Sequence, residues 1–203
     1  MGDPDRLPSL LASLRSALDP LPAAAPPPAP PPPLQLAAVL LLLDPGDPAL
    51  PLLFIERGPD LRNHPGQIAF PGGGYEAADG HLGAAALRET EEELGIPADA
   101  VELIGSLPPR RTHASQFLLT PFVGLQHRPV RLRPNPGEIA DWFRVPLGEL
   151  LQGHPPSTRE VTREGEVVTI YSYQHGPHTI WGITAGILHT LLERLAPAPR
   201  TRA

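Results

Sequence analysis

The chain of 203 residues contains neither cysteine nor lysine. The absence of thiols excludes disulfide bonds, zinc–thiolate centres and a cysteine nucleophile. All 16 basic residues are arginine, which excludes Schiff-base chemistry on a lysine and a P-loop lysine. Any phosphate group that this chain binds must therefore be held by arginine, histidine or backbone N–H groups.

Positive charge and long apolar runs are also scarce. The formal net charge is −6, whereas generic nucleic-acid binding depends on neutralising phosphates with basic side chains. The longest apolar run, Leu36–Leu43, has the length of a strand and is too short to span a membrane. Because Asp3 and Asp5 interrupt the start of the chain, we expect no secretory signal. These features predict a cytoplasmic protein that binds neither nucleic acid nor membranes.

Apolar residues recur at helical spacing between Leu7 and Leu18, which predicts a short amphipathic helix. Residues 20–33 are almost all proline and alanine and should form an extended, polyproline-like segment. We interpret this segment as a stiff spacer, and the alternative is a docking motif for a proline-binding module. The predicted division of the chain is an N-terminal helix in residues 1–19, the proline-rich spacer in residues 20–33, a folded domain in residues 34–196 and a tail in residues 197–203.

The folded domain has many strand candidates and few helices, which predicts a single sandwich of mixed α/β architecture. Leu36–Leu43 is apolar throughout, as in a strand covered on both faces. Ile180–Leu195 has apolar residues at helical spacing and should be a core helix. Trp142 and Trp181 are expected to lie in the core. The other predicted strands are Leu50–Arg57, Gln67–Phe70, Val101–Leu107, Phe117–Leu125 and Val167–Tyr173, with a strand-like segment at Glu138–Leu147 that runs into a short helix at Leu147–Leu151.

The stretch Arg88–Ile96 contains four carboxylates on what should be a helix. At about 100° per residue, Glu89, Glu92 and Glu93 lie within about a third of the helix circumference, opposite apolar leucines. Three oxygen-rich side chains on one patch suit a hard divalent cation. On this stretch alone two interpretations stay open, a metal site and a solvated acidic face.

Glycines precede this helix in the sequence Phe70-Pro71-Gly72-Gly73-Gly74. Glycine permits positive φ angles and a close approach of the backbone to a ligand. The connection to the acidic helix is short enough to hold both the glycine turn and the helix against one substrate. This arrangement favours the metal-site interpretation.

The segment from the glycine turn to Ile96 resembles the signature of the Nudix hydrolases, G-x5-E-x7-R-E-U-x-E-E-x-G-U, in which U is an apolar residue. The first half of the signature departs from this pattern, because Gly80 stands at the glutamate position when Gly74 is aligned with the glycine. With a loop one residue longer, Gly73 and Asp79 would take these two positions. The second half is represented by Arg88, Glu89, Glu92, Glu93, Gly95 and Ile96, with Thr90 in the first apolar position.

Within this family the chain resembles the coenzyme A diphosphatases. Two further segments, Glu138–Leu147 and Ile180–Ala185, are similar to segments of this branch, whereas its opening Leu-Leu-Thr-x-Arg-Ser is altered here to Leu53–Gly58. The resemblance covers roughly Leu36–Leu195. The upstream motif of the branch has counterparts at Arg57, His64, Gly66, Gln67, Phe70, Pro71, Gly72 and Gly73, followed by Asp79.

The resemblance implies a Nudix-type α/β/α sandwich with a mixed β-sheet. It also implies hydrolysis of a nucleoside diphosphate derivative with Mg²⁺ or Mn²⁺ as the cofactor. Glu89, Glu92 and Glu93 would bind the metal, and the backbone carbonyl of Gly72 or Gly73 would be a further ligand.

Other residues of the signature would support this chemistry. Arg88 would orient the carboxylates through charge-assisted hydrogen bonds. The general base is left open between Glu92, Glu89 and Glu138, and Glu138 has the alternative interpretation of a solvated loop residue or a helix cap. Asp79 would hold a water molecule near the site or form a turn.

The predicted substrate contacts are Arg57, His64, Arg110 and Arg111. Coenzyme A has a 3′-phosphate besides its diphosphate, so arginines near the adenosine end are physically sensible; alternatively, Arg110 and Arg111 are solvated loop residues. The implied function is cleavage of coenzyme A, or its derivatives, to 3′,5′-ADP and 4′-phosphopantetheine. The alternatives are a Nudix hydrolase of ADP-ribose or NADH and a catalytically silent Nudix-fold binding module, and a homodimer is left open.

Overall fold

The apolar run at residues 36–43 forms β1 (Gln35–Leu43), the middle strand of an eight-stranded sheet. β1 pairs in parallel with β7 (Phe117–Gln126) over nine residue pairs. Because the other partners of β1 are antiparallel, the sheet is mixed, as predicted. The structure is a computed structural model that describes residues 6–61, 63–112, 116–153, 156–163 and 165–196.

Antiparallel strands extend the sheet on both sides of β1. Their bounds are β2 (Pro51–Arg57), β3 (Ile68–Ala69), β4 (Gly72–Gly74), β5 (Val101–Ser106), β6 (Arg110–Arg111) and β8 (Ile139–Pro146). On one side, β2 pairs with β1, β3 and β8. On the other side, β5 and β6 pair with β7. The short β4 pairs with β1 itself, which brings the glycine-rich segment next to the centre of the sheet.

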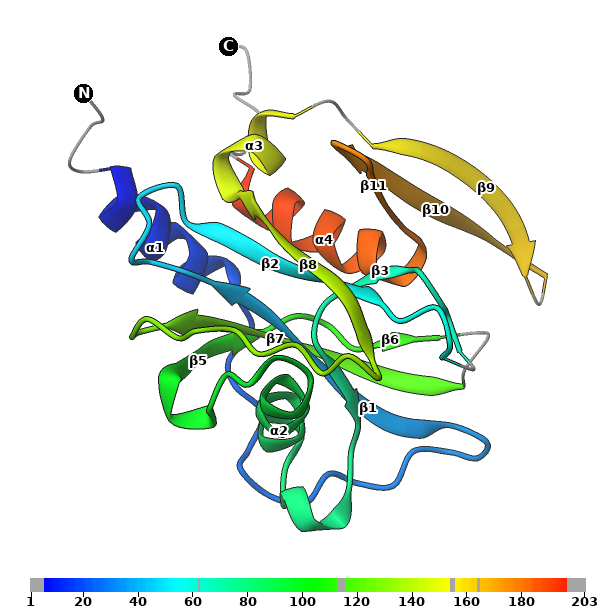
Figure 1. Cartoon of the computed structure of the whole chain (residues 1–203). Helices are drawn as coiled ribbons and strands as arrows, with labels where there is room; N and C mark the ends of the chain where they lie inside the picture. The colour runs from blue at the N-terminus through cyan, green and yellow to red at the C-terminus, as the bar shows by residue number, and fades with distance from the viewer. Residues whose placement is uncertain (1–5, 62, 113–115, 154–155, 164, 197–203) are drawn as a thin grey trace.

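Helices cover both faces of this sheet, because successive residues of β1 point to opposite sides. On one side, Leu41 belongs to a core cluster that also contains residues of α1 (Arg6–Ala17) and α4 (Gly182–Leu195). On the other side, Leu40 belongs to a second core cluster, which contains residues of α2 (Leu82–Leu94). The sheet separates α2 from α1 and α4 in the cartoon (Figure 1). The predicted α/β/α sandwich is therefore confirmed.

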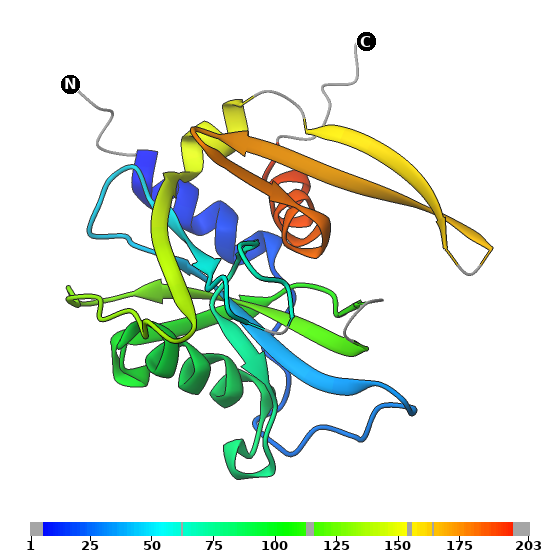
Figure 2. The ribbon, with the colours of Figure 1, turned by 45° about the vertical axis from the view of Figure 1, so that its right-hand side comes forward.

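A second, three-stranded sheet extends from the body of the molecule beside α4 (Figure 2). Its strands are antiparallel in the order β11-β10-β9, with bounds β9 (Ser157–Arg163), β10 (Glu166–His175) and β11 (His178–Trp181). A short helix, α3 (Leu147–Gln152), leads into it, and two 3-10 turns flank α2, η1 (Ala77–Asp79) before it and η2 (Ala98–Ala100) after it. None of the described helices is long and apolar enough to cross a membrane.

Two predictions from the sequence are wrong, one on the start of α4 and one on the two tryptophans. The helix predicted from Ile180 begins at Gly182, because Ile180 and Trp181 end β11 and pair with β10. Trp142 and Trp181, which we expected in the core, are 38% and 46% exposed. Trp142 lies on β8, which pairs only with β2 among the described strands and is therefore an edge strand. Trp181 lies at the end of β11, where the chain turns into α4.

The N-terminal helix packs into the main core. Leu14 is fully buried within the cluster that α1 shares with α4. Arg194 of α4 donates hydrogen bonds to the carbonyl oxygen of Ala17 at 3.1 Å and to the carboxylate of Asp19 at 3.0 Å. Residues 20–33 form no helix or strand, in keeping with the predicted spacer. The division of the chain into segments stays a prediction, and residues 1–5 and the tail at 197–203 lie outside the described residues.

Replacing Leu14 tests whether α1 is part of the core. Leu14→Ala should lower the free energy of unfolding by about 2–5 kcal/mol, because it removes a buried side chain and leaves a cavity. The matched control is Leu21→Ala at a position that is 45% exposed, where the expected change is within about 0.5 kcal/mol. Urea denaturation followed by circular dichroism measures both. Equal effects of the two substitutions would mean that α1 does not contribute to the core.

Candidate functional site

The strand β4 consists of three glycines, and two of them meet other groups too closely for a side chain. A Cβ atom on Gly72, whose φ is +143°, would lie 2.3 Å from the carbonyl oxygen of Ala38. A Cβ atom on Gly73 would lie 2.4 Å from the carboxylate carbon of Glu89. Only a strand without side chains lets this carboxylate rest directly on the backbone.

Helix α2 presents its carboxylates to this strand because its ends and its apolar side are fixed. The side chain of His81 caps the first turn by accepting a hydrogen bond from the backbone N–H of Ala84 at 3.1 Å. Gly95 ends the helix in the left-handed conformation, with its N–H donating to the carbonyl oxygen of Glu91 at 2.8 Å. Leu94 is fully buried against the sheet. Glu93 and Glu89 of the same helix then lie against Gly72 and Gly73 of β4.

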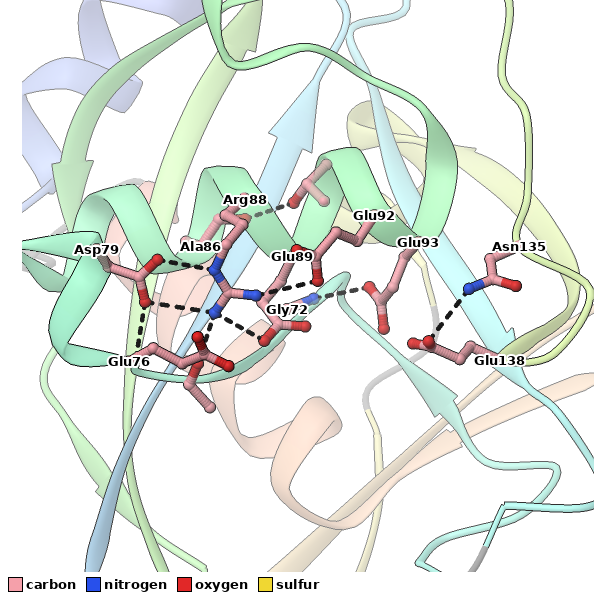
Figure 3. A network of polar contacts seen from close by, with 12 residues as sticks. Gly72, Glu76, Asp79, Ala86, Arg88, Glu89, Glu92, Glu93, Asn135 and Glu138 are labelled. Carbon is pink, nitrogen blue, oxygen red and sulfur yellow. Dashed lines mark hydrogen bonds and ion pairs between the residues drawn. The ribbon is translucent and has the colours of Figure 1, made fainter.

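Arg88 is the centre of a polar network that joins α2 to the glycine segment (Figure 3). Its Nε donates to the carboxylate of Asp79 at 2.7 Å and its Nη2 to the carbonyl oxygen of Gly74 at 2.9 Å. Nη1 donates to the carboxylate of Glu92 at 3.0 Å, and Nη2 lies 3.0 Å from a carboxylate oxygen of Glu89. The hydrogen bond to Asp79 and the neighbouring carboxylates raise the pKa of Arg88, so the guanidinium stays charged.

Asp79, rather than Gly80, supplies the carboxylate that the first half of the signature requires. Its side chain is only 4% exposed, and it also accepts a hydrogen bond from the backbone N–H of Glu76 at 2.8 Å. Burial works to raise the pKa of Asp79, but the hydrogen bond and charge of Arg88 outweigh it, so the pKa is lowered. The structure thus agrees with the longer of the two loop alignments, in which Gly73 and Asp79 take the signature positions.

Glu93 is the most buried carboxylate of the site, with 2% of its surface exposed. It accepts a hydrogen bond from the backbone N–H of Gly72 at 2.9 Å. Burial raises the pKa of Glu93 to about 8, and the negative charges of Glu89 and Glu138 add to this effect. The pKa of Glu89 is also raised, first by burial. Burial and the neighbouring negative charges therefore favour the protonated forms of Glu89 and Glu93.

The tertiary fold brings Glu138 from a distant loop to this cluster. Its carboxylate accepts a hydrogen bond from the side-chain amide of Asn135 at 3.1 Å, and its carbonyl oxygen accepts one from the N–H of Gly58 at 2.7 Å. Its charge raises the pKa values of both Glu89 and Glu93. Figure 3 shows the side chain of Glu138 beside that of Glu93.

The donor set suits a hard divalent cation, although the carboxylates are not yet gathered around one point. Within the described residues no three histidine, aspartate or glutamate side chains form a ready-made cation site. Arg88 draws the carboxylate of Glu92 toward itself, but this side chain is 55% exposed and can turn by rotamer change. A cation would offset the burial, and with it the repulsion, that raises the pKa values of Glu89 and Glu93. The residues present therefore fit such an ion.

A cleft of about 640 Å³ lies on the α4 side of the sheet and reaches the same glycine strand. This volume is in the range of small-molecule sites. Its walls come from β1, β7, β10 and the first turns of α4, and they are largely apolar. All four residues predicted to contact substrate line the cleft, together with the three glycines of β4: Arg57, His64, Arg110, Arg111, Gly72, Gly73 and Gly74.

Arg57 connects the cleft to the carboxylates. It lines the cleft, and its positive charge lowers the pKa of Glu93 against the effect of burial. Its Nε atom is buried and has no hydrogen-bond partner among the described residues. His64 lies nearby in a left-handed backbone conformation with φ of +59°, which is uncommon for a residue other than glycine. Backbone strain of this kind often occurs at ligand sites.

Sequence reasoning missed two features of the site. Trp181 lines the cleft instead of packing in the core. Thr190 of α4 accepts a hydrogen bond from Arg110, a contact that joins residues far apart in the sequence. Neither the exposure of Trp181 nor the contact between Thr190 and Arg110 follows from the periodicity of the sequence. The glycine directly after Trp181 is a local signal that could have indicated the end of a strand at this tryptophan.

Removing the charge of Asp79 tests its hold on Arg88. Asp79→Asn should lower the free energy of unfolding by about 1.5–3 kcal/mol, because it weakens a buried charge-assisted hydrogen bond. It should also release the guanidinium that orients Glu89 and Glu92. Glu76→Gln, at an exposed position of the same turn, is the control and should change stability by less than about 0.5 kcal/mol. Chemical denaturation measures both, and an Asp79→Asn protein as stable as the control would contradict this assignment.

The raised pKa of Glu93 predicts a pH-dependent stability of the metal-free protein. The pKa of about 8 means that the folded chain keeps this proton up to about pH 8, whereas a glutamate in the unfolded chain releases it near pH 4.5. Between these values the folded state binds more protons than the unfolded state, so stability should fall as pH rises. Glu93→Gln should remove this part of the slope, and Glu91→Gln should keep it. Urea midpoints in EDTA across this pH range provide the measurement; identical slopes for all three proteins would refute the prediction.

Several known proteins are similar to this chain in sequence. The NUDIX domain family model matches residues 33–165. An uncharacterized Nudix hydrolase NudL from Photorhabdus laumondii is 41% identical over 144 residues, which cover 71% of this chain and 76% of that protein. A NudL from Pectobacterium atrosepticum is 36% identical over 152 residues, covering 75% of this chain and 79% of that one.

Solved structures show the same fold. The crystal structure of a NUDIX hydrolase from Alicyclobacillus acidocaldarius is 19% identical in sequence and has a TM-score of 0.50, with 59% of this chain and 82% of that chain covered. At this identity the likeness concerns the fold alone. The matched family model and the NudL relatives lead to one conclusion: the chain is a member of the Nudix hydrolases, the enzymes that act on phosphoanhydride bonds.

Proposed function

We propose that this Nudix hydrolase cleaves the diphosphate of coenzyme A or its derivatives, releasing 3′,5′-ADP and 4′-phosphopantetheine, with Mg²⁺ or Mn²⁺ as the cofactor. The observation that supports this best is that β4 borders both the carboxylate cluster and the cleft. A diphosphate at the glycines would have carboxylates on one side and the basic, partly apolar cleft on the other. A small nucleotide substrate with a long, mainly uncharged arm suits such a cleft.

Different residues of this chain would bind the cation, orient its ligands and bind the diphosphate. Glu89, Glu92 and Glu93, with the carbonyl oxygen of Gly73, would hold the cation. When bound, the cation supplies positive charge to the diphosphate and lowers the pKa of water. Arg88 would keep Glu89 in place through its contact of 3.0 Å, and Glu92 would turn from Arg88 toward the cation. Arg57 would donate its unpartnered Nε–H to a phosphate oxygen.

For the general base we propose Glu138, with Glu89 and Glu92 as the alternatives. Glu89 and Glu92 are both held by Arg88, which lowers their availability for a proton. Glu138 has a single side-chain hydrogen bond among the described residues, from Asn135. Its carboxylate lies close enough to Glu93 and Glu89 to affect their pKa values. It can therefore accept a proton at the edge of the cluster.

A substrate panel tests the proposed function. Steady-state rates with coenzyme A, ADP-ribose and NADH, each with Mg²⁺ and with Mn²⁺, should give the highest kcat/KM for coenzyme A. Mass spectrometry of the products in ¹⁸O water identifies the phosphorus that is attacked. EDTA should abolish turnover, and added metal should restore it. A clear preference for ADP-ribose or NADH would overturn the coenzyme A assignment while leaving the hydrolase in place.

A matched pair of substitutions on α2 tests the carboxylates themselves. Glu92→Gln should lower kcat by about 100-fold or more, because the site loses a charged ligand for the cation. Glu91→Gln, at the exposed neighbouring position, should leave kcat within about 2-fold. Turnover of coenzyme A by the two variants decides the question. If Glu92→Gln were fully active, a catalytic role for the cluster would be wrong.

A further inference from the structure

Arg110 occupies a defined place relative to the glycine strand. Four residues stand side by side on neighbouring strands: Arg110 pairs with Leu119, Leu119 with Ala37, and Ala37 with Gly74. Three strand spacings separate the first from the last, which is about 14 Å between their backbones. Paired residues on adjacent strands point to the same face, and Leu119 and Ala37 belong to the core on the α4 side. Arg110 therefore lies on the cleft side of the sheet.

Helix α4 holds the guanidinium of Arg110 through a hydrogen bond. Its Nη2 donates a short hydrogen bond to the hydroxyl of Thr190. This hydroxyl in turn donates to the carbonyl oxygen of Gly186 at 3.1 Å. Because the single hydroxyl proton is used toward Gly186, the oxygen of Thr190 can only accept from Arg110. The direction of the contact is thus fixed.

Gly186 lies beside this guanidinium. A Cβ atom there would lie 3.6 Å from Nη1 of Arg110 and 3.9 Å from its Cζ, at ordinary van der Waals distance, so the guanidinium packs directly against this turn of α4. The other N–H groups of the guanidinium have no hydrogen-bond partner among the described residues, and Arg110 lines the cleft. The guanidinium is therefore held by α4 through Nη2, and its remaining N–H groups can donate to an anion such as a phosphate.

We propose that Thr190 and Gly186 are positioning residues that hold Arg110 to bind a phosphate of the substrate other than those of the cleaved diphosphate. This inference rests on the proposed function, because it assumes that the diphosphate lies at β4. The separation of about 14 Å leaves room for a ribose between the two groups. In coenzyme A the group in question is the 3′-phosphate. Arg110 then selects phosphorylated over dephosphorylated ribose, and Thr190 sets the strength of that selection.

Paired ligands that differ only in this phosphate test the inference in the full-length chain. The kinetic pair is coenzyme A and dephospho-coenzyme A, and the binding pair for calorimetry is 3′,5′-ADP and 5′-AMP. Thr190→Val should raise the KM for coenzyme A about 10-fold with kcat unchanged, and weaken 3′,5′-ADP binding about 10-fold. Dephospho-coenzyme A and 5′-AMP should change by less than about 2-fold. Arg110→Gln should act on the same ligands at least as strongly.

Two control variants separate positioning from general damage. Thr190→Ser keeps the hydroxyl and should behave like the wild type. Thr162→Val makes the same change on β9 at an exposed position outside the cleft and should also have no effect. Equal losses with both members of a ligand pair would overturn the inference, because they indicate a structural role. An unchanged discrimination in Thr190→Val and Arg110→Gln would overturn it as well.

Failure of the proposed function gives a different result. In that case the wild type cleaves neither coenzyme A nor dephospho-coenzyme A. The calorimetric comparison then decides the inference by itself. Tighter binding of 3′,5′-ADP than of 5′-AMP by the wild type, lost in Thr190→Val, supports it, and equal binding of the two nucleotides refutes it.

Discussion

The contacts of one guanidinium hold the site together. Arg88 joins a buried carboxylate at Asp79, the carbonyl oxygen of Gly74 and the helix carboxylates Glu89 and Glu92. These contacts connect η1, β4 and α2. Because arginine is planar and always charged, it can satisfy several acceptors at once in a fixed geometry. The spacing between the glycine strand and the acidic face of α2 depends on this group.

The lack of side chains on β4 is the second constraint. The carboxylate of Glu89 rests where a Cβ of Gly73 would be, and the N–H of Gly72 is available to Glu93. The cleft on the α4 side reaches the same glycines. A strand with ordinary side chains would separate these two regions. The glycines therefore place the carboxylates next to the basic cleft that we propose as the substrate site.

Much of the fold could be predicted from periodicity. The uninterrupted apolar run at Leu36–Leu43 indicates a strand buried on both faces, and β1 is covered by helices on both sides. The helical spacing between Leu7 and Leu18 predicts α1, and Gly95 predicts the end of α2. The sequence pattern does not predict β9, β11 or the short strands β4 and β6, and it predicts the start of α4 two residues early. Both errors lie where exposed residues and a glycine with positive φ replace a periodic pattern.

The sequence by itself determined the identity of the chemical groups: the absence of cysteine and lysine, the glutamates on one face of α2 and the arginines available for phosphate. The spacing of these residues along one helix is a local property, so it can be read without the fold. Only the tertiary structure decided that Asp79 pairs with Arg88, that Glu138 approaches Glu93, and that Thr190 holds Arg110. These contacts join strands, loops and helices that are distant in sequence, and their geometry follows from sheet pairing and core packing rather than from any local pattern.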